Sequence, residues 1–228
     1  MPFQTSAVLA SWAALFVYLE LSGRWSEFLA ARVAWIVPVA AVLFGVAALG
    51  QAAVALWGGR SVVTWSGASL CAAGVLPVLL VMAVPIDPLS SFAADRRSAY
   101  SSATFASVAP PKHGESLTFQ QLVAASASAE TRAALADRAG EAVELVGLVT
   151  APDGEGFLLT RFVVACCVVD ATVAQVEVRP AATGPLEENA WVRVSGRLAL
   201  GSDGVPRLDD ASVEAADRPD PPYLYPGG

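Results

Sequence analysis

The chain has 228 residues, of which 55% are hydrophobic and only 15% are charged, and its formal net charge is −7. So large an apolar share excludes an ordinary soluble domain, and the acidic balance argues against binding to the phosphate backbone of nucleic acids. Residues 33–86 carry one formally charged side chain, Arg60, whereas the segment after Ile86 carries 19 acidic and 11 basic side chains. The sequence therefore predicts a membrane part joined to an acidic, water-soluble part.

The membrane part, residues 1–86, contains three apolar stretches at about 6–23, 33–57 and 66–85. A helix needs roughly 20 residues to cross the hydrocarbon core, so each stretch is long enough. The first could instead be a signal peptide, but it lacks a basic n-region and a clear small-residue cleavage site. We therefore expect three transmembrane helices in contact with the lipid bilayer.

The arginines indicate the orientation of these helices. With three spans, the loop that holds Arg24 and Arg32 lies on the same side as the C-terminal part, and Arg60 lies on the opposite side. Arg96 and Arg97, some distance after the third span, add to the first side. Because cytoplasmic loops are richer in Lys and Arg, the distribution favours a cytoplasmic C-terminal part, although without the last two arginines the difference is only two to one.

The soluble part begins with a segment rich in Ser, Ala and Pro, residues 87–115, which is typical of a linker. Residues 116–140 then contain good helix formers with apolar residues at helical spacing. This pattern predicts one or two helices, capped by Ser116 or Thr118 and ending near Gly140.

From Ala142 onward the hydrophobic period changes to two. Five such segments follow, separated by turn signals, at residues 141–151, 156–171, 174–180, 190–200 and 206–217. Five short strands in fewer than 90 residues suit a small closed barrel, which hides its sheet edges. We therefore predict that residues 116–228 form a small α+β domain with an OB-like, five-stranded β-barrel.

Two adjacent cysteines lie in the apolar run "RFVVACCVVDA", residues 161–171. In a regular strand, successive side chains point to opposite faces, so Cys166 and Cys167 would not both face one ion unless a bulge intervened. Cys166 shares its predicted face with Phe162, Val164 and Val168, so we expect it to be the buried one. A disulfide between neighbours would close a small strained ring. The simplest interpretation is that both cysteines are packing residues.

A metal or thiol site is the alternative interpretation. Zinc usually takes four N or S ligands, or three ligands and a water molecule. Cys166 and Cys167 are candidate ligands, with Asp170 as a nearby carboxylate, and a zinc ion is the one cofactor left open. His113, the single histidine, is expected to be a solvated linker residue, and Cys71 belongs to the third span.

The ends of this run and of the chain carry further candidates. Arg161 and Asp170 are either solvated strand ends or functional groups, with Arg161 binding an anion or a partner, or pairing with Asp170 to fix the barrel. Their opposite strand parity argues against direct contact. Tyr223 and Tyr225 stand between prolines in "PPYLYP". That segment is either a loose tail or a stiff extended segment that docks on the barrel, on a partner or on the membrane surface.

Signatures of catalysis are scarce in this sequence. It contains no P-loop, GxGxxG, GxSxG or HExxH pattern, and a single histidine leaves few routes to a catalytic triad. We therefore expect a protein that is not an enzyme and does not bind nucleic acid.

Six segments, in chain order, carry a resemblance to a known family: "PLSSFAADRR", "LTFQQL", "VELVGLV", "FLLTRFVVACCVVDA", "WVRVSGRL" and "PPYLYP". With the N-terminal helices, they make the chain similar to the YcgQ-like family of bacterial membrane proteins. The resemblance implies a multi-pass protein of the bacterial cytoplasmic membrane, partnered with a YraQ/YcgR-like permease and associated with metal homeostasis, zinc especially. Some relatives carry a His-rich loop between the second and third helices, whereas this chain has "GGRSVVTWSG".

Two functional hypotheses follow. In the first, the protein is an accessory subunit of a permease-type transport system, with its helices beside the permease and its barrel recognising the permease, a soluble factor or the transported species. In the second, it is a metal- or thiol-responsive module that senses or passes on an ion through Cys166 and Cys167.

Overall fold

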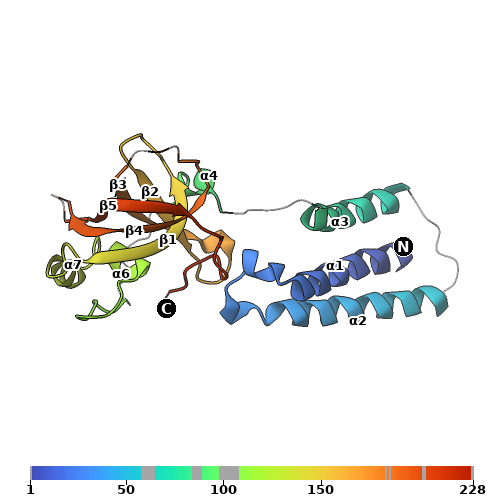
Figure 1. Cartoon of the computed structure of the whole chain (residues 1–228). Helices are drawn as coiled ribbons and strands as arrows, with labels where there is room; N and C mark the ends of the chain where they lie inside the picture. The colour runs from blue at the N-terminus through green and yellow to red at the C-terminus, as the bar shows by residue number, and fades with distance from the viewer. Residues whose placement is uncertain are drawn as a thin grey trace. The chain divides into compact units, whose positions relative to one another are not determined.

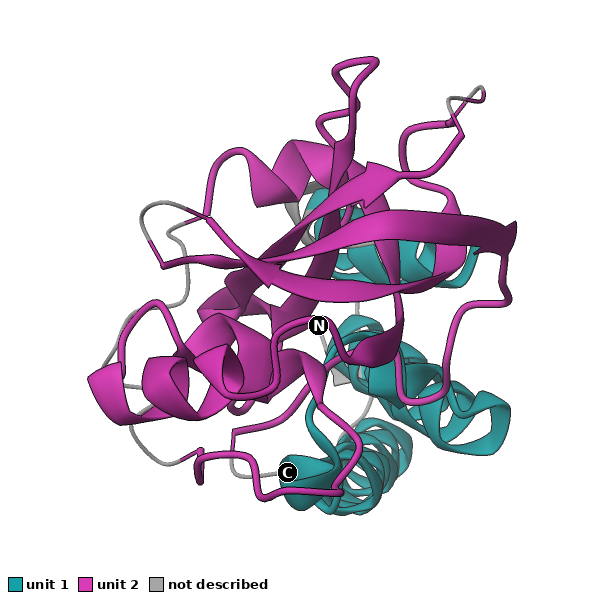
Figure 2. Ribbon diagram, turned by 60° about the vertical axis from the view of Figure 1, so that its left-hand side comes forward, with its two compact units in different colours: residues 1–87 teal, residues 88–228 magenta. Residues whose placement is uncertain are grey.

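A computed structural model describes residues 2–57, 65–83, 89–97, 108–182, 184, 186–201 and 204–226. The chain divides into two compact units, Met1–Asp87 and Pro88–Gly228, which are coloured separately in Figure 2. Figure 1 labels the helices of the first unit and the strands and short helices of the second. Each unit is described by itself.

The first unit contains α1 (Pro2–Ser22), α2 (Ile36–Trp57) and α3 (Trp65–Ala83), with short 3-10 turns at Arg24–Glu27 and Ala31–Val33. By length and composition, two helical segments could cross a membrane, Phe3–Ser22 and Ala31–Trp57. In α3, the apolar helical stretch is shorter, Cys71–Ala83. Two of the three predicted spans thus have a suitable helix, and the third remains a prediction.

Small residues and aromatic rings hold α1 against its neighbours. A Cβ added at Gly74 of α3 would lie 2.8 Å from Val8 Cγ1, so glycine permits this close approach. Trp12 of α1 stacks on Phe44 of α2, with ring centroids 6.2 Å apart, and its Nε1 donates to the Gly74 carbonyl at 3.1 Å. These contacts specify how the helices of this unit pack.

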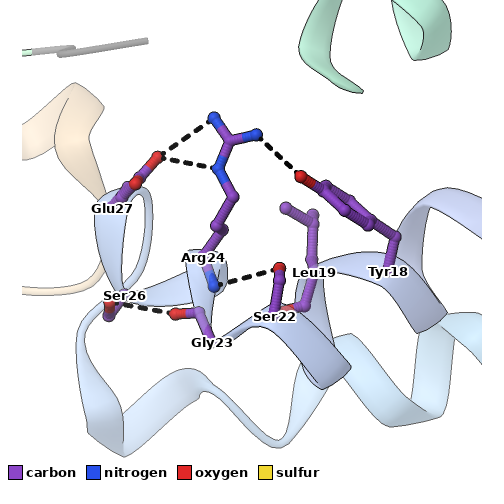
Figure 3. A network of polar contacts seen from close by, with 7 residues as sticks. All are labelled: Tyr18, Leu19, Ser22, Gly23, Arg24, Ser26 and Glu27. Atoms are coloured by element: carbon purple, nitrogen blue, oxygen red, sulfur yellow. Dashed lines mark hydrogen bonds and ion pairs between the residues drawn. The ribbon is translucent and has the colours of Figure 1, made fainter. Parts of the chain in front are cut away.

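A network of polar contacts lies at the C-terminal end of α1, as Figure 3 shows. Arg24 donates from Nη1 to the Tyr18 hydroxyl at 3.1 Å, and from Nε and Nη2 to Glu27 Oε2, both at 3.4 Å. Gly23, with φ of 71°, lets the chain leave the helix. The arginine side chain is thereby held between a phenol and a carboxylate just outside the apolar segments.

The second unit is built on a closed barrel with strand order β1-β2-β3-β5-β4. Its strands are β1 (Ala142–Thr150), β2 (Phe157–Val163), β3 (Thr172–Pro180), β4 (Trp191–Leu200) and β5 (Pro206–Ala215). β3 and β5 pair in parallel, and the other pairs are antiparallel. Alternate aliphatic side chains fill its interior, among them Leu145, Val149, Leu159, Val176, Val194 and Leu208. The prediction of a small closed barrel of five strands is confirmed.

Two short helices lie in the predicted helical segment, α6 (Phe119–Ala124) and α7 (Ala129–Ala136). Thr118 caps α6: its hydroxyl accepts from the Gln121 amide, and the Gln121 side chain accepts from the Thr118 amide. Phe119 and Leu122 of α6 join the barrel core, and Gly140 ends the helical region with φ of 86°. The predicted helices and their Thr118 cap are confirmed.

Parts of the predicted linker pack onto the barrel unit. The short helix α4 (Ser91–Ala94) contacts β1, and the Ser91 amide donates to Asn189 Oδ1 at 2.7 Å. The buried Arg138 binds the carbonyls of Lys112 and Glu115. The described residues of 89–115 therefore belong to the barrel unit. Residues 87–88 and 98–107 of the predicted linker lie outside the described residues.

The α6 cap gives a test of local stability. We expect Thr118→Ala to lower the free energy of unfolding of the barrel unit by about 1 kcal/mol, because the Gln121 amide loses its acceptor. Ser126→Ala is the matched control: Ser126 Oγ donates to the Val123 carbonyl on the exposed end of α6 and caps no amide. Urea denaturation measures both, and equal effects of the two variants would contradict the assigned cap.

Candidate metal centre

The chain leaves strand β2 before it reaches the two cysteines. β2 ends at Val163, and a short 3-10 turn occupies Val168–Asp170. The Asp170 carboxylate causes the bend: Oδ1 accepts from the Ala165 amide at 2.8 Å, and Oδ2 accepts from the Cys166 amide at 2.7 Å and the Cys167 amide at 3.4 Å. The prediction of one strand through residues 156–171 is therefore wrong, because these amides turn toward a side chain instead of a neighbouring strand.

This bend places both cysteines on one side of the loop. Their Sγ atoms are 3.7 Å apart, Cys166 is exposed, and Cys167 is half-buried. The expectation that Cys166 would be buried, with Cys167 on the opposite face, is wrong because strand alternation stops at Val163. Among the described residues, the ligand atoms of Cys166, Cys167 and Asp170 form a group in which all lie within 4.8 Å of one another.

The three side chains influence one another's protonation. A side-chain hydrogen bond to Asp170, together with the neighbouring Cys167 sulfur, raises the pKa of the Cys166 thiol to about 11. For Asp170, partial burial alone would raise the pKa, but hydrogen bonds from the Cys166 thiol and from the three amides outweigh it and lower the pKa. Without a metal ion, the centre therefore holds a carboxylate beside a protonated Cys166.

Asp170 gains a free acceptor position when Cys166 loses its proton, and it still holds the loop. A carboxylate oxygen has two lone pairs, and Oδ2 already accepts two amides. Oδ1 accepts one amide, from Ala165, so its other lone pair is left for the Cys166 thiol and becomes free when that thiol loses its proton. Asp170 can thus orient the loop through its amides and still offer one oxygen to a metal ion.

Two contacts from distant parts of the chain support the loop. Arg97 Nη1 donates to the Ala171 carbonyl at 2.9 Å and approaches the Val169 carbonyl at 3.4 Å. On the other side, the Leu224 amide donates to the Phe162 carbonyl at 2.8 Å and the Val164 amide to the Leu224 carbonyl at 2.9 Å. Sequence reasoning counted Arg97 only for orientation, and no local signal linked it to this loop.

The C-terminal segment docks on the barrel, one of the alternatives that its prolines and tyrosines left open. Leu224 forms a parallel bridge with Val163 at the end of β2, and Tyr223 is buried. The Tyr225 carbonyl accepts from Gln120 Nε2 of α6 at 3.0 Å. These contacts fix the segment beside the strand that leads into the cysteine loop.

Arg161 is buried, so the interpretation of a solvated strand end is wrong. The pairing of β1 with β2 ends where Leu148 meets Thr160. At the next position along β2, Arg161 Nη1 instead donates to the Val146 carbonyl of β1 at 3.2 Å. The guanidinium carbon lies 5.5 Å from the centre of the Trp191 ring, and Nε has no acceptor. Desolvation lowers the pKa of Arg161 to about 10. No ion pair joins it to Asp170 among the described residues.

The remaining sequence candidates lie outside this group. His113 is exposed in the segment before Ser116 and is not among the grouped ligand atoms of the described residues. Cys71 lies in α3 of the first unit, where its Sγ is 3.9 Å from the Gln4 carbonyl oxygen. The candidate centre therefore consists of Cys166, Cys167 and Asp170.

The raised pKa of Cys166 gives a second prediction. The rate of its alkylation by iodoacetamide should rise about tenfold for each pH unit between 8 and 10, because the thiolate fraction does so below the pKa. Asp170→Asn removes the carboxylate charge and should increase the rate at pH 8. Asp153→Asn is the control, since Asp153 also accepts two backbone amides but lies in another turn. Tandem mass spectrometry distinguishes Cys166 from Cys167, and a rate that levels off below pH 9 would contradict the assignment.

Comparison with known proteins gives a match to a protein family. No curated protein and no solved structure matches the chain. Residues 116–226 match the family model described as the DUF1980 C-terminal domain. The match covers the barrel, the short helices α6 and α7, the cysteine loop and the docked C-terminal segment. This part of the chain is therefore similar to the DUF1980 C-terminal domain.

Proposed function

We propose that the barrel unit binds a zinc ion through Cys166, Cys167 and Asp170. The observation that carries the proposal is the 3.7 Å separation of the two Sγ atoms. Two thiolates that bind zinc at about 2.3 Å with a tetrahedral angle between them lie about 3.8 Å apart. The cysteine loop thus holds its sulfurs at the spacing of two zinc ligands before any ion is bound.

The ligand types favour zinc over the hard cations. Calcium and magnesium bind oxygen almost exclusively, whereas zinc accepts thiolates together with a carboxylate. Asp170 would contribute the Oδ1 lone pair that the Cys166 thiol leaves free when it loses its proton. Zinc binding would replace the thiol proton of Cys166, and the negative charges of the three ligands would then face a dication instead of one another.

A second candidate function, compatible with the first, is that of an accessory subunit of a bacterial permease-type transport system. Its support is an apolar row along α2 that the first unit leaves exposed, formed by Val39, Val42, Leu43, Val46 and Leu49. Their helical spacing places them along one side of α2, where they suit lipid or the helix of another membrane protein. We propose that this row lies against the bilayer or a YraQ/YcgR-like permease.

The family group, the third span and the side of the membrane are part of this proposal. We assign the chain to the YcgQ-like group, with α3 as a third span and the barrel on the cytoplasmic side of the bacterial membrane. The arginine distribution and the six quoted segments support this assignment. The strand order of the barrel, with its single parallel pair β3–β5, supports an OB-like classification. Protease digestion in intact cells tests the orientation, and co-purification with the permease tests the partnership.

Zinc binding can be tested on the full chain in detergent micelles. Titration with Zn²⁺ against a chromogenic competitor should give one high-affinity zinc per chain, and Mg²⁺ at millimolar concentration should not displace it. Failure to retain zinc against a competitor of micromolar affinity would remove the proposal.

A further inference from the structure

We propose that this centre is an exchange site, in which the ion is held by three ligands from this chain and passes directly to a thiol-bearing acceptor that occupies the fourth position. This inference rests on the proposed zinc function and adds the way in which the ion leaves. Three features of the centre support it: the number of ligands, their exposure and the contacts that hold the loop in place.

The number of ligands indicates an open coordination position. Structural zinc sites are closed by four protein ligands, whereas sites that admit another ligand have three. Among the described residues, the grouped ligand atoms come from three side chains, Cys166, Cys167 and Asp170. The third cysteine, Cys71, lies in α3 and is not among these grouped atoms. A tetrahedral ion in this loop would therefore have one position free.

The surroundings of the ligands indicate that another molecule can reach that position. Cys166 is exposed, and Val169, within the same loop, is 83% exposed. A buried structural site would instead keep solvent and other ligands away. An apolar residue beside the centre also suits contact with a protein acceptor better than with water alone.

The loop is nevertheless held in place. Arg97 binds the carbonyls of Val169 and Ala171, the Cys167 carbonyl accepts the Asp170 amide at 3.0 Å, and Leu224 fixes the end of β2. Ligand exchange can thus proceed at the exposed sulfur while the other two ligands stay in position. Cys166, the exposed thiolate, is the first ligand to leave.

The exchange step is balanced in atoms and charge. The acceptor thiol forms a new zinc–sulfur bond as the bond from zinc to Cys166 Sγ breaks, and the proton of the acceptor thiol passes to Cys166 Sγ. No electron is transferred, and zinc remains divalent. Repetition at Cys167 with a second acceptor thiol, followed by replacement of the Asp170 oxygen by a water molecule, completes the transfer.

Two measurements on the full chain in detergent test this inference. In the first, zinc-loaded protein is mixed with a dithiol, and a chromogenic indicator reports loss of zinc. Direct exchange predicts an initial rate that rises about tenfold when the dithiol concentration is raised tenfold, because the acceptor takes part in the slow step. A rate that does not depend on dithiol concentration would overturn the inference, since zinc would then dissociate first.

In the second measurement, cobalt replaces zinc and a monothiol is added. A free fourth position predicts a stronger sulfur-to-cobalt charge-transfer band, as a third thiolate joins the first two. An unchanged band at saturating monothiol would overturn the inference, because the coordination shell would be closed. Failure of the proposed function is distinguishable from both results, since the chain would then bind neither zinc nor cobalt at the start.

Discussion

Replacing both Cys166 and Cys167 by serine should abolish stoichiometric zinc binding while the barrel remains folded. Loss of a residue that only supports a metal ligand already lowers affinity by about 10–100-fold, so loss of both thiolates should lower it by more than about 100-fold. Cys166 is exposed and Cys167 is half-buried in a loop outside the barrel strands, so two serines should change the free energy of unfolding little. Competition titration measures the affinity, and circular dichroism checks the fold.

Cys71→Ser is the matched control for the double variant. It also removes a thiol, but from α3, and it should leave the zinc stoichiometry unchanged. Zinc retained by the double variant, or lost from the control, would show that the cysteine loop does not hold the ion.

Arg138→Ala should be the most destabilising of the substitutions considered, lowering the free energy of unfolding by about 2–4 kcal/mol. The Arg138 side chain is 3% exposed; it pairs with Glu141 at 2.6 Å and donates to the carbonyls of Lys112 and Glu115. Its removal deletes these hydrogen bonds and detaches the segment before Ser116 from the barrel, and hydrogen bonds that involve a charged group contribute about 1.5–3 kcal/mol.

Denaturation of a fragment comprising residues 88–228 measures this effect. Arg197→Ala is the control, because Arg197 is exposed on β4, where its Nη1 donates to the Gly140 carbonyl at 3.3 Å. It should change the free energy by less than about 0.5 kcal/mol. An Arg138→Ala fragment as stable as the control would show that residues 108–115 do not depend on this side chain.

The barrel could be predicted from the sequence because its pattern is local. Apolar side chains alternate along Ala142–Thr150 and Trp191–Leu200, and a capping threonine precedes α6. The helices of the first unit were equally evident from their length and apolar composition. Each of these signals arises within one element, so no knowledge of distant contacts is needed.

The cysteine loop could not be predicted in the same way. The apolar run through Val163, Val164 and Ala165 continues the pattern of a strand, and what ends the strand is the Asp170 carboxylate, which competes for the amides. One signal was available: Cys167 and Asp170 stand three residues apart, the spacing of a capping box, which the structure forms here. That spacing indicates that strand alternation stops before Cys167.

The burial of Arg161 between β1 and β2 depends on contacts between residues far apart in sequence. The arginine is buried because β1 separates from β2 and exposes the Val146 carbonyl, and Leu224 then adds to the edge of β2. Neither event has a local signature in the sequence. The same holds for Arg97, whose contact with the loop joins residues 74 positions apart.

The most direct test of the account is X-ray absorption at the zinc edge of the loaded full chain. We expect two sulfur ligands at about 2.3 Å and the remaining ligands as oxygen or nitrogen at about 2.0–2.2 Å, with the sulfur contribution lost in the double serine variant. A coordination shell of oxygen and nitrogen alone in the native chain would contradict the assignment of zinc to Cys166 and Cys167.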